Sequence, residues 1–317
     1  MYCALSLLQA NMDQVYTGSL VVVNLLWTFL KMFYCIGEAI YKLLVPMKEK
    51  DVKGEIVLVT GAGHGIGKEL ALKYASLGAT VVCWDLNQEF NEETVTEIKK
   101  IGGTFAYGYT CDVSKREEVL KVAEKVKEEV GNVTILINNA GIMPCHSFLD
   151  HTPEEIRNIF DVNVLAHFWV LQAFLPSMIE KNHGHIVALS SMAGMIGLSN
   201  LVPYCASKFA VRGFMEALSE ELREYSKGRI SNINFTTIYP YIVDTGLCKK
   251  PRIKFKNFMA MLSPKEAANI IVRAQRMNWS NISIPRYLLG MNTIFRVFPE
   301  KSSNHVKDFF DTGIEAT

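Results

Sequence analysis

Hydrophobic residues form one long run near the start of the chain. Gln14–Leu30 holds seventeen uncharged residues, and apolar residues resume after Lys31. A membrane-spanning helix needs about 20 apolar residues, so the run is marginal unless Lys31 extends its ammonium toward lipid headgroups. We predict that residues 1–50 form a hydrophobic helix that anchors the protein, either spanning the membrane or lying in its interface. The alternative is a helix packed on the globular part.

The positive charges near this run are distributed unevenly. Residues 1–30 contain no lysine or arginine, whereas lysines follow at positions 31, 42, 48, 50 and 53. Positive residues are retained on the cytoplasmic side of a membrane. The bias therefore predicts that the part of the chain after the anchor faces the cytosol.

After residue 50 the pattern changes to short apolar runs that alternate with helical stretches. The runs lack the polar alternation of a half-exposed sheet, which is typical of parallel strands covered by helices on both faces. We therefore predict an α/β fold for residues 51–317: a single domain with a Rossmann-like, doubly wound parallel sheet. The predicted strands are 56–59, 80–84, 104–109, 134–138, 185–189 and 233–238.

The helices between these strands carry recognisable start signals. Ser114 with Glu117 has the spacing of a capping box, and Thr152-Pro153 has the composition of a helix start. One predicted helix follows the first strand and ends at residue 77, and another begins at residue 152. The remaining predicted helices cover 92–101, 114–130, 164–180 and 203–226.

Composition narrows the classes of function. The formal net charge of the 317-residue chain is +1, which argues against a nucleic-acid-binding protein. Its seven cysteines lack the C-x-x-C spacing of zinc sites, so we predict no metal centre and no disulfide framework.

A glycine-rich turn follows the first predicted strand. Thr60–Gly67 reads T-G-A-G-H-G-I-G, which is T-G-x-x-x-G-x-G and not G-x-G-x-x-G, because Ile66 takes the place of the last glycine. Glycines permit a tight turn and let backbone amides approach a pyrophosphate at a helix N-terminus. The turn therefore predicts a dinucleotide site.

An acidic residue ends the second predicted strand. Asp85 lies after Trp84 and before Leu86 and Asn87, with no lysine or arginine beside it. A carboxylate here accepts hydrogen bonds from ribose hydroxyls and repels a 2′-phosphate. We therefore expect NAD as the cofactor, with NADP less favoured.

A tyrosine and a lysine share one face of the predicted helix 203–226. Tyr204 and Lys208 are four residues apart, and a cation beside a phenol favours the phenolate that a general base requires. Ser191, at the end of the fifth strand, supplies a hydroxyl for a substrate oxygen; Ser190 is the adjacent alternative.

Taken together, these ordered motifs resemble the short-chain dehydrogenase/reductase family. The resemblance rests on the glycine turn, Asn138–Gly141, Asn163, Ser191 and the Tyr204/Lys208 pair. It implies that Tyr204 is the general base, that Lys208 binds the nicotinamide ribose and lowers the tyrosine pKa, that Ser191 and Tyr204 bind substrate, and that Asn163 supports a proton-relay water. The cofactor residues that it implies are Thr60, Gly61, Gly65, Ile66, Gly67, Asp85, Asp112 (at the adenine), Asn138, Ala140, Gly141, Tyr204, Lys208 and Thr245.

Within that family the chain resembles the membrane-attached branch with the 17-beta-hydroxysteroid dehydrogenases 11 and 13 and epidermal retinol dehydrogenase 2. The segments that carry this likeness are the apolar N-terminus, Gly54–Gly67, Asn182–Val187 and Phe298–Glu300. The likeness implies NAD-dependent oxidation of an alcohol on a retinoid, steroid or other lipid, at the endoplasmic reticulum or lipid droplets, by a homodimer. The alternatives are an NADPH-linked carbonyl reductase and a membrane scaffold that retains cofactor binding.

The C-terminal part departs from the family and adds apolar surface. Pro240 is followed by Tyr241 where the family often has glycine, and we expect Tyr241 to shape the mouth of the site. The apolar and basic segment 251–262 is a candidate substrate lid, and 286–298 is a second apolar stretch that we expect to bury against the core.

Overall fold

The computed structural model describes residues 2–45, 48–102, 105–226, 231–248, 251–252, 254, 260–310 and 313–315. The chain divides into two compact units, Met1–Glu49 and Lys50–Thr317. Each unit is described by itself.

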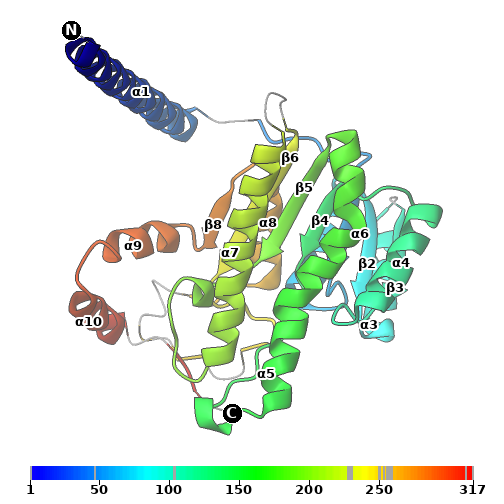
Figure 1. Ribbon diagram of the computed structural model, residues 1–317. Helices are drawn as coiled ribbons and strands as arrows, with labels where there is room; N and C mark the ends of the chain where they lie inside the picture. Colours follow the sequence, from blue (N-terminus) through cyan, green and yellow to red (C-terminus); the bar gives the residue numbers. More distant parts are fainter. Residues whose placement is uncertain are drawn as a thin grey trace. The chain divides into compact units, whose positions relative to one another are not determined.

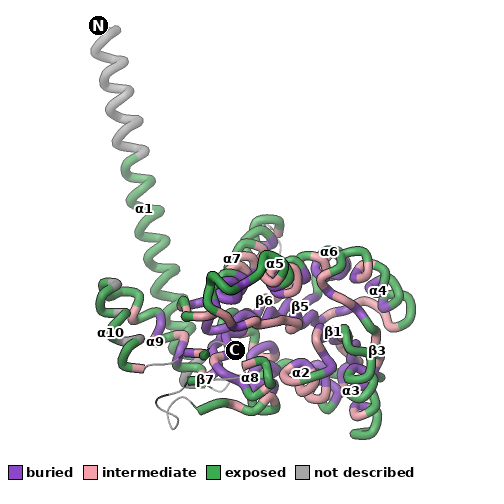
Figure 2. The backbone as a smooth tube through the Cα atoms, turned by 90° about the horizontal axis from the view of Figure 1, so that it is seen from below, coloured by how far each residue is buried: buried purple, intermediate pink, exposed green. Residues whose placement is uncertain are grey.

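The first unit is the helix α1, Tyr2–Leu44. Its stretch Gly18–Tyr41 has 24 residues and a mean hydropathy of 1.8, with none of them buried (Figure 2). A helix of that length reaches about 36 Å, enough for a hydrocarbon core of about 30 Å. The apolar stretch is longer than the seventeen-residue run because it continues past Lys31, whose ammonium lies 5.4 Å from the Trp27 ring.

One further described segment is long and apolar enough to span a membrane. Pro153–Lys181 passes the same test of length and composition, but half of its apolar window is buried within the second unit. It is therefore a core segment of that unit.

The second unit is built on a seven-stranded parallel sheet (Figure 1). Its strand order, β3-β2-β1-β4-β5-β6-β8, confirms the predicted doubly wound fold. The six predicted strands each overlap an observed one, and β8 is a seventh that the sequence pattern did not predict. The strands are β1 Ile56–Thr60, β2 Thr80–Asp85, β3 Ala106–Thr110, β4 Ile135–Asn138, β5 Gly184–Leu189, β6 Ile233–Pro240 and β8 Asn281–Ile284.

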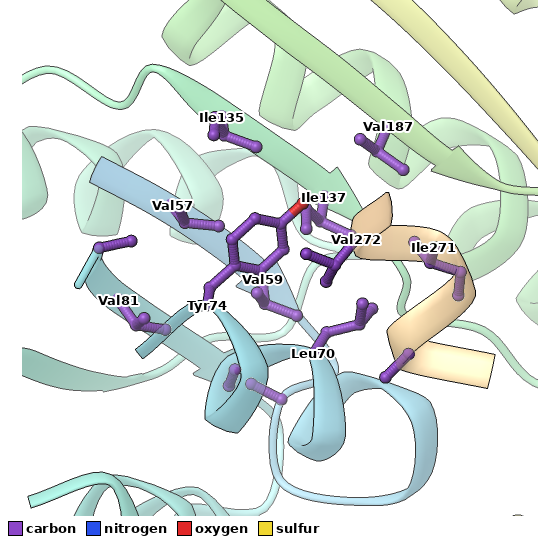
Figure 3. Packing of buried hydrophobic residues seen from close by; sticks show 14 of the residues in the cluster. Val57, Val59, Leu70, Tyr74, Val81, Ile135, Ile137, Val187, Ile271 and Val272 are labelled. Atoms are coloured by element: carbon purple, nitrogen blue, oxygen red, sulfur yellow. The ribbon is translucent and has the colours of Figure 1, made fainter. Parts of the chain in front are cut away.

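Helices cover both faces of this sheet because successive side chains of each strand point to opposite faces. On one face Val57 and Val59 of β1 pack under α2, Gly65–Ser76, with Leu70 and Tyr74 close to them (Figure 3). The helices α3, Gln88–Lys100, and α8, Pro264–Arg276, complete that layer.

The other face carries a second layer of three helices. Leu58 of β1, between Val57 and Val59, packs there with Trp84 and Phe174. The helices of this layer are α4 Arg116–Glu129, α6 Ala166–Lys181 and α7 Val202–Tyr225. The sheet is thereby enclosed, which explains the unalternating apolar strands in the sequence.

Two predicted helix starts were wrong, and both corrections have a local cause. Lys115 has an extended backbone and takes the N-cap position one residue after Ser114, so α4 starts at Arg116 without a capping box, and the Ser114 hydroxyl donates to the carboxylate of Asp112. Helix α3 begins before residue 92 because the Asn87 side chain accepts from the amide of Phe90 and caps it. Thr104, at the start of the predicted third strand, lies outside the described residues.

The C-terminal region adds short elements outside the seven-stranded sheet. They are α9 Tyr287–Phe295, α10 Glu300–Phe310 and an antiparallel pair of β7 Pro251–Arg252 with β9 Gly313–Ile314. The predicted burial of 286–298 holds only in part, because Leu288 and Asn292 are buried while Val297 and Phe298 are exposed. Positions 253 and 255–259 of the candidate lid lie outside the described residues.

Strand order reverses between β1 and β4, since β2 and β3 lie on one side of β1 and β4, β5, β6 and β8 lie on the other. Open parallel sheets bind ligands at such a switch point, outside the carboxyl ends of the strands. The loops that follow β1, β4, β5 and β6 therefore converge at one edge.

Candidate active site

A cavity of about 480 Å³ lies at this edge. Most of the predicted site residues line it, although they come from positions as far apart as 61 and 245. The predicted residues in its wall are Gly61, Gly65, Ile66, Asp85, Ala140, Gly141, Ser191, Tyr204, Lys208 and Thr245.

The glycine turn forms one end of the cavity. Gly61 and Gly65 have φ angles of +67° and +58°, a region that glycine adopts without strain. A Cβ on Gly67 would stand 1.9 Å from the carbonyl oxygen of Gly61. The N-cap residue of α2, His64, makes no side-chain capping bond. The turn thus has the close backbone packing and the helix N-terminus that fit a pyrophosphate.

Threonine and asparagine side chains tie this turn to the loop after β4. The Thr60 hydroxyl accepts from the amides of Asn139 (3.0 Å) and Ala140 (3.1 Å). The Asn139 side chain donates to the carbonyls of Thr60 (2.9 Å) and Gly61 (3.2 Å). Asn139 also lines the cavity, whereas Asn138 is buried at the end of β4 and does not.

Asn139 lies within the predicted motif Asn138–Gly141 but was not itself named among the cofactor residues. The motif contains two adjacent asparagines, and the pattern did not show which one leaves the strand toward the site. The register of β4, which ends at Asn138, decides it.

Asp85 lines the same end of the cavity. Its carboxylate accepts from the amides of Gly63 (2.8 Å) and Asn87 (2.9 Å), so it is held in place by the turn that it faces. Among the described lining residues, Lys208 is the sole lysine or arginine. His64, which was not predicted as a site residue, lies beside Asp85 in the wall.

Asp112 lies away from the described cavity wall. Its carboxylate accepts from the hydroxyl of Ser114 at 2.6 Å and pairs with the ammonium of Lys115 at 3.2 Å. These two contacts hold the carboxylate of Asp112 at the start of α4. Its predicted contact with adenine stays a prediction.

Ser191, Tyr204 and Lys208 meet at the other end of the cavity. Tyr204 and Lys208 lie one turn apart on α7, and the lysine ammonium is 5.7 Å from the centre of the phenol ring. The Lys208 ammonium donates to the carbonyl of Leu189 at 2.8 Å, which ties it to the end of β5. A side-chain hydrogen bond joins Ser191 to Tyr204.

The neighbouring Ser190 makes a different hydrogen bond. Its hydroxyl donates to the carbonyl of Lys208 at 2.9 Å, so it fastens the end of β5 to α7. The Ser191 hydroxyl instead accepts from the amide of Ala193 and faces the phenol. Of the two serines, Ser191 therefore has the geometry suited to a substrate oxygen.

Burial moves the pKa values of the tyrosine and the lysine in opposite directions. It raises the pKa of Tyr204 to about 12, although the hydrogen bond from Ser191 lowers it. It lowers the pKa of Lys208 to about 8. The lowered tyrosine pKa expected from the sequence includes the charge of the bound nicotinamide and stays a prediction. In the protein without ligands, removal of the phenolate from water outweighs its polar neighbours.

Comparison with known proteins agrees with this geometry. A family model for short chain dehydrogenases matches residues 55–254. The chain belongs to that family. Bovine short-chain dehydrogenase/reductase family 16C member 6 (Bos taurus) is 46% identical over 81% of this chain and 80% of its own. Membership makes the protein an NAD(P)-dependent alcohol dehydrogenase.

Two further relatives lie in the branch that the sequence resembles. Mouse epidermal retinol dehydrogenase 2 (Mus musculus) is 41% identical over 91% of this chain and 92% of its own. Human 17-beta-hydroxysteroid dehydrogenase 13 (Homo sapiens) is 38% identical over 89% of this chain and 92% of its own.

Solved structures share the fold of this dehydrogenase. A short chain dehydrogenase/reductase from Burkholderia phymatum, in complex with NAD, matches with a TM-score of 0.69 and 25% identity over 77% of this chain and 93% of that one. A metagenomic short-chain oxidoreductase in complex with NADP matches with a TM-score of 0.62 and 27% identity over 74% of this chain and 97% of that one.

Asn163 links the loop after β4 of the dehydrogenase to helix α7. It lies in a π-helical turn, Asp161–Leu165, which joins α5 (Pro153–Phe160) to α6. Its side-chain amide exchanges hydrogen bonds with the backbone of Ile142, both at 2.9 Å, and donates to Ser207 at 3.1 Å. A π turn often marks a functional position, because it turns one side chain out of helical register.

Gly141 shows how close Asn163 lies to Lys208. A Cβ there would stand 3.2 Å from the Asn163 side-chain oxygen and 3.5 Å from the Lys208 ammonium. The two side chains therefore flank the same backbone position.

Residues of the loop after β6 also line the dehydrogenase cavity. Thr245 reaches the glycine turn, since a Cβ on Gly65 would stand 3.0 Å from its methyl carbon. Tyr241 lines the cavity, as expected, and packs against a buried cluster that includes Met195 and Leu288. Among the described residues, no group of three or more acidic, histidine or cysteine side chains could hold a metal ion.

Proposed function

We propose that this dehydrogenase oxidises an alcohol on a lipophilic molecule, with NAD as cofactor and Ser191, Tyr204 and Lys208 as its catalytic residues. The observation that carries the proposal is the meeting of these three side chains in the wall of one cavity with the glycine turn. A tyrosine hydrogen-bonded to a hydroxyl and close to a buried ammonium can, in its phenolate form, accept a proton from an alcohol.

NAD is favoured over NADP by Asp85. Its carboxylate lies in the wall beside the glycine turn, where it suits a ribose diol and opposes a 2′-phosphate. A phosphate there would need a positive partner, and in the described wall the one fixed cation is Lys208, at the catalytic end.

A lipophilic substrate is favoured by the lining around the catalytic end. Its side chains are mostly aliphatic or thioether, and such a lining favours burial of a hydrocarbon skeleton. The names of the similar proteins, which include retinol and estradiol dehydrogenases, point to the same class. The apolar lining residues are Met143, Met192, Ile196, Leu198, Leu201, Leu247 and Ile314.

In this mechanism the nicotinamide ring supplies the acceptor for a hydride. Tyr204 takes the proton of the substrate hydroxyl, while Ser191 donates a hydrogen bond to the oxygen as it becomes a carbonyl. Lys208 favours the phenolate form of Tyr204 by its charge. Asn163 acts as a positioning residue, because it holds the loop at Ile142 next to Lys208.

We place the enzyme at a membrane of the endoplasmic reticulum or a lipid droplet, as a homodimer with its catalytic unit facing the cytosol. The exposed apolar stretch Gly18–Tyr41 supports the membrane attachment. The lysines that follow residue 30 support the orientation.

Replacement of the proposed base tests the function. NADH formation by the detergent-solubilised full chain would be measured with retinol, steroid alcohols and long-chain alcohols. We expect Tyr204→Phe to lower kcat at least 100-fold, within the range usual for loss of a general base, and to leave NADH binding largely intact.

Tyr225→Phe is the matched control, since Tyr225 ends the same helix and is 78% exposed. It should behave like the unmodified protein. Retention of most activity by Tyr204→Phe with every substrate would remove Tyr204 from the chemistry.

A further inference from the structure

We propose that Ile314, near the C-terminus, forms the outer wall of the substrate end of the cavity and limits the bulk of the alcohol that the enzyme accepts. This inference rests on the proposed function and adds a specificity-determining residue to it.

Ile314 lies against the catalytic end of the cavity. It lines the wall and packs on a buried cluster that contains Tyr204, Leu201 and Cys145. The glycine turn and Asp85, which suit the dinucleotide, line the same cavity but are not part of this cluster. A side chain beside the catalytic tyrosine and away from the dinucleotide end is placed to contact the carbon skeleton of the substrate.

Backbone bonds from separate segments hold this strand in place. Residues 313–314 pair with β7, Pro251–Arg252. The side chain of Asn200 donates to the carbonyl of Ile314 at 3.0 Å, and the Cys145 thiol donates to the carbonyl of Glu315 at 3.4 Å. Because consecutive carbonyls are bonded from two different loops, the strand has little freedom to move away from the site.

The strand geometry decides which side chain faces inward. Successive residues of an extended strand point to opposite sides. Ile314 is partly buried in the cavity wall, whereas Glu315 is exposed. Isoleucine is β-branched and has few rotamers, so it presents a stiff surface to the substrate.

Size-changing substitutions at this position test the proposal. Ile314→Trp narrows the cavity and Ile314→Ala widens it. Glu315→Ala is the matched control, because it changes the neighbouring exposed side chain of the same strand. The substrates are a small alcohol, cyclohexanol, and two bulky ones, estradiol and retinol.

We expect Ile314→Trp to lower kcat/KM for the bulky alcohols at least tenfold relative to the control, and to change the value for cyclohexanol less than twofold. Ile314→Ala should raise the ratio of bulky to small kcat/KM. One extra or missing methylene in an apolar pocket is commonly worth about 10–200-fold in selectivity. NADH affinity should be the same in all variants.

Equal effects on small and bulky alcohols, or values within twofold of the control for both variants, would overturn the proposal. Calorimetric titration of the NADH-loaded protein with estradiol separates it from the proposed function. If no alcohol is oxidised by the unmodified chain, the proposed function fails. In that case, the proposal that Ile314 forms the cavity wall is supported if Ile314→Trp still weakens estradiol binding tenfold relative to Glu315→Ala. It is contradicted if the two variants bind estradiol equally.

Discussion

Tyr204 and Lys208 lie one helical turn apart, and burial affects their pKa values in opposite senses. Both charged forms lose water, so the phenol keeps its proton to a higher pH and the ammonium loses its proton at a lower one. In the ligand-free enzyme at neutral pH, Tyr204 is therefore protonated and Lys208 is charged. The base form of Tyr204 becomes more available as the pH rises.

The lowered pKa of Lys208 predicts a pH-dependent stability. Below pH 8 the lysine is charged in both the folded and the unfolded chain. Between about 8 and the usual value of 10.5, the unfolded chain binds the proton and the folded one does not, so the free energy of unfolding rises with pH. We expect the unmodified protein to gain stability relative to Lys208→Met between pH 7.5 and 9.5.

Denaturant unfolding of both full-length proteins, without cofactor, measures this difference. Tyr204 is present in both proteins, so its titration drops out of the difference between their free energies of unfolding. A difference that stays constant over the pH range would show that burial does not lower the lysine pKa.

Asp85 gives a second prediction at this scale. Asp85→Ala removes the charge that opposes a 2′-phosphate, so the preference for NAD over NADP should fall at least tenfold in kcat/KM. Asp85→Asn distinguishes loss of the charge from loss of the hydrogen bond, because it removes the charge but retains an oxygen that can accept from the amide of Gly63. If neither variant changes the NAD to NADP ratio, Asp85 does not contact the ribose.

At the scale of elements, helix starts show how local signals compete. The side chains of Thr152 and Glu155 form a complete capping box at the start of α5. The same kind of signal at Ser114 fails, because the N-cap position falls one residue later, on Lys115, and Ser114 is out of register for the cap.

The cap at α5 predicts a measurable loss of stability. Thr152 is exposed, so Thr152→Ala should remove the cap without disturbing the core, at a cost of about 1 kcal/mol. For a unit of this size the melting temperature should fall by about 2–4 °C. Thr152→Ser, which keeps the hydroxyl, is the control and should melt near the unmodified value; equal melting of the alanine and serine variants would contradict the role of the cap.

For the whole molecule, the exposed helix α1 predicts how the protein partitions. A charged side chain near the centre of a spanning helix costs about 2.5–3.5 kcal/mol. The double variant Val22→Asp/Leu26→Asp should therefore be released from membranes by carbonate washing, while the unmodified chain stays in the pellet. Leu149→Asp, at a residue 88% exposed in the catalytic unit, is the control. Retention of the double variant would argue against α1 as the anchor.

The sequence by itself determined the fold class and the main site motifs. Apolar strand runs, the Thr60–Gly67 turn and the Tyr204/Lys208 spacing are local patterns, and local patterns are set by neighbouring residues along the chain. β8 escaped prediction because it has four residues, two of them polar, and its partner β6 lies more than forty positions earlier. The roles assigned to the site residues remain predictions that the experiments above test.

Tertiary structure alone decided the rest. It brought Asn139 into the cavity wall beside the glycine turn, and it brought Ile314 to Tyr204 from more than a hundred positions away. It also set how far burial raises the pKa of Tyr204 in the ligand-free chain, since burial depends on every element that surrounds the phenol. Such contacts are fixed by how the whole chain packs, and no spacing along the sequence contains them.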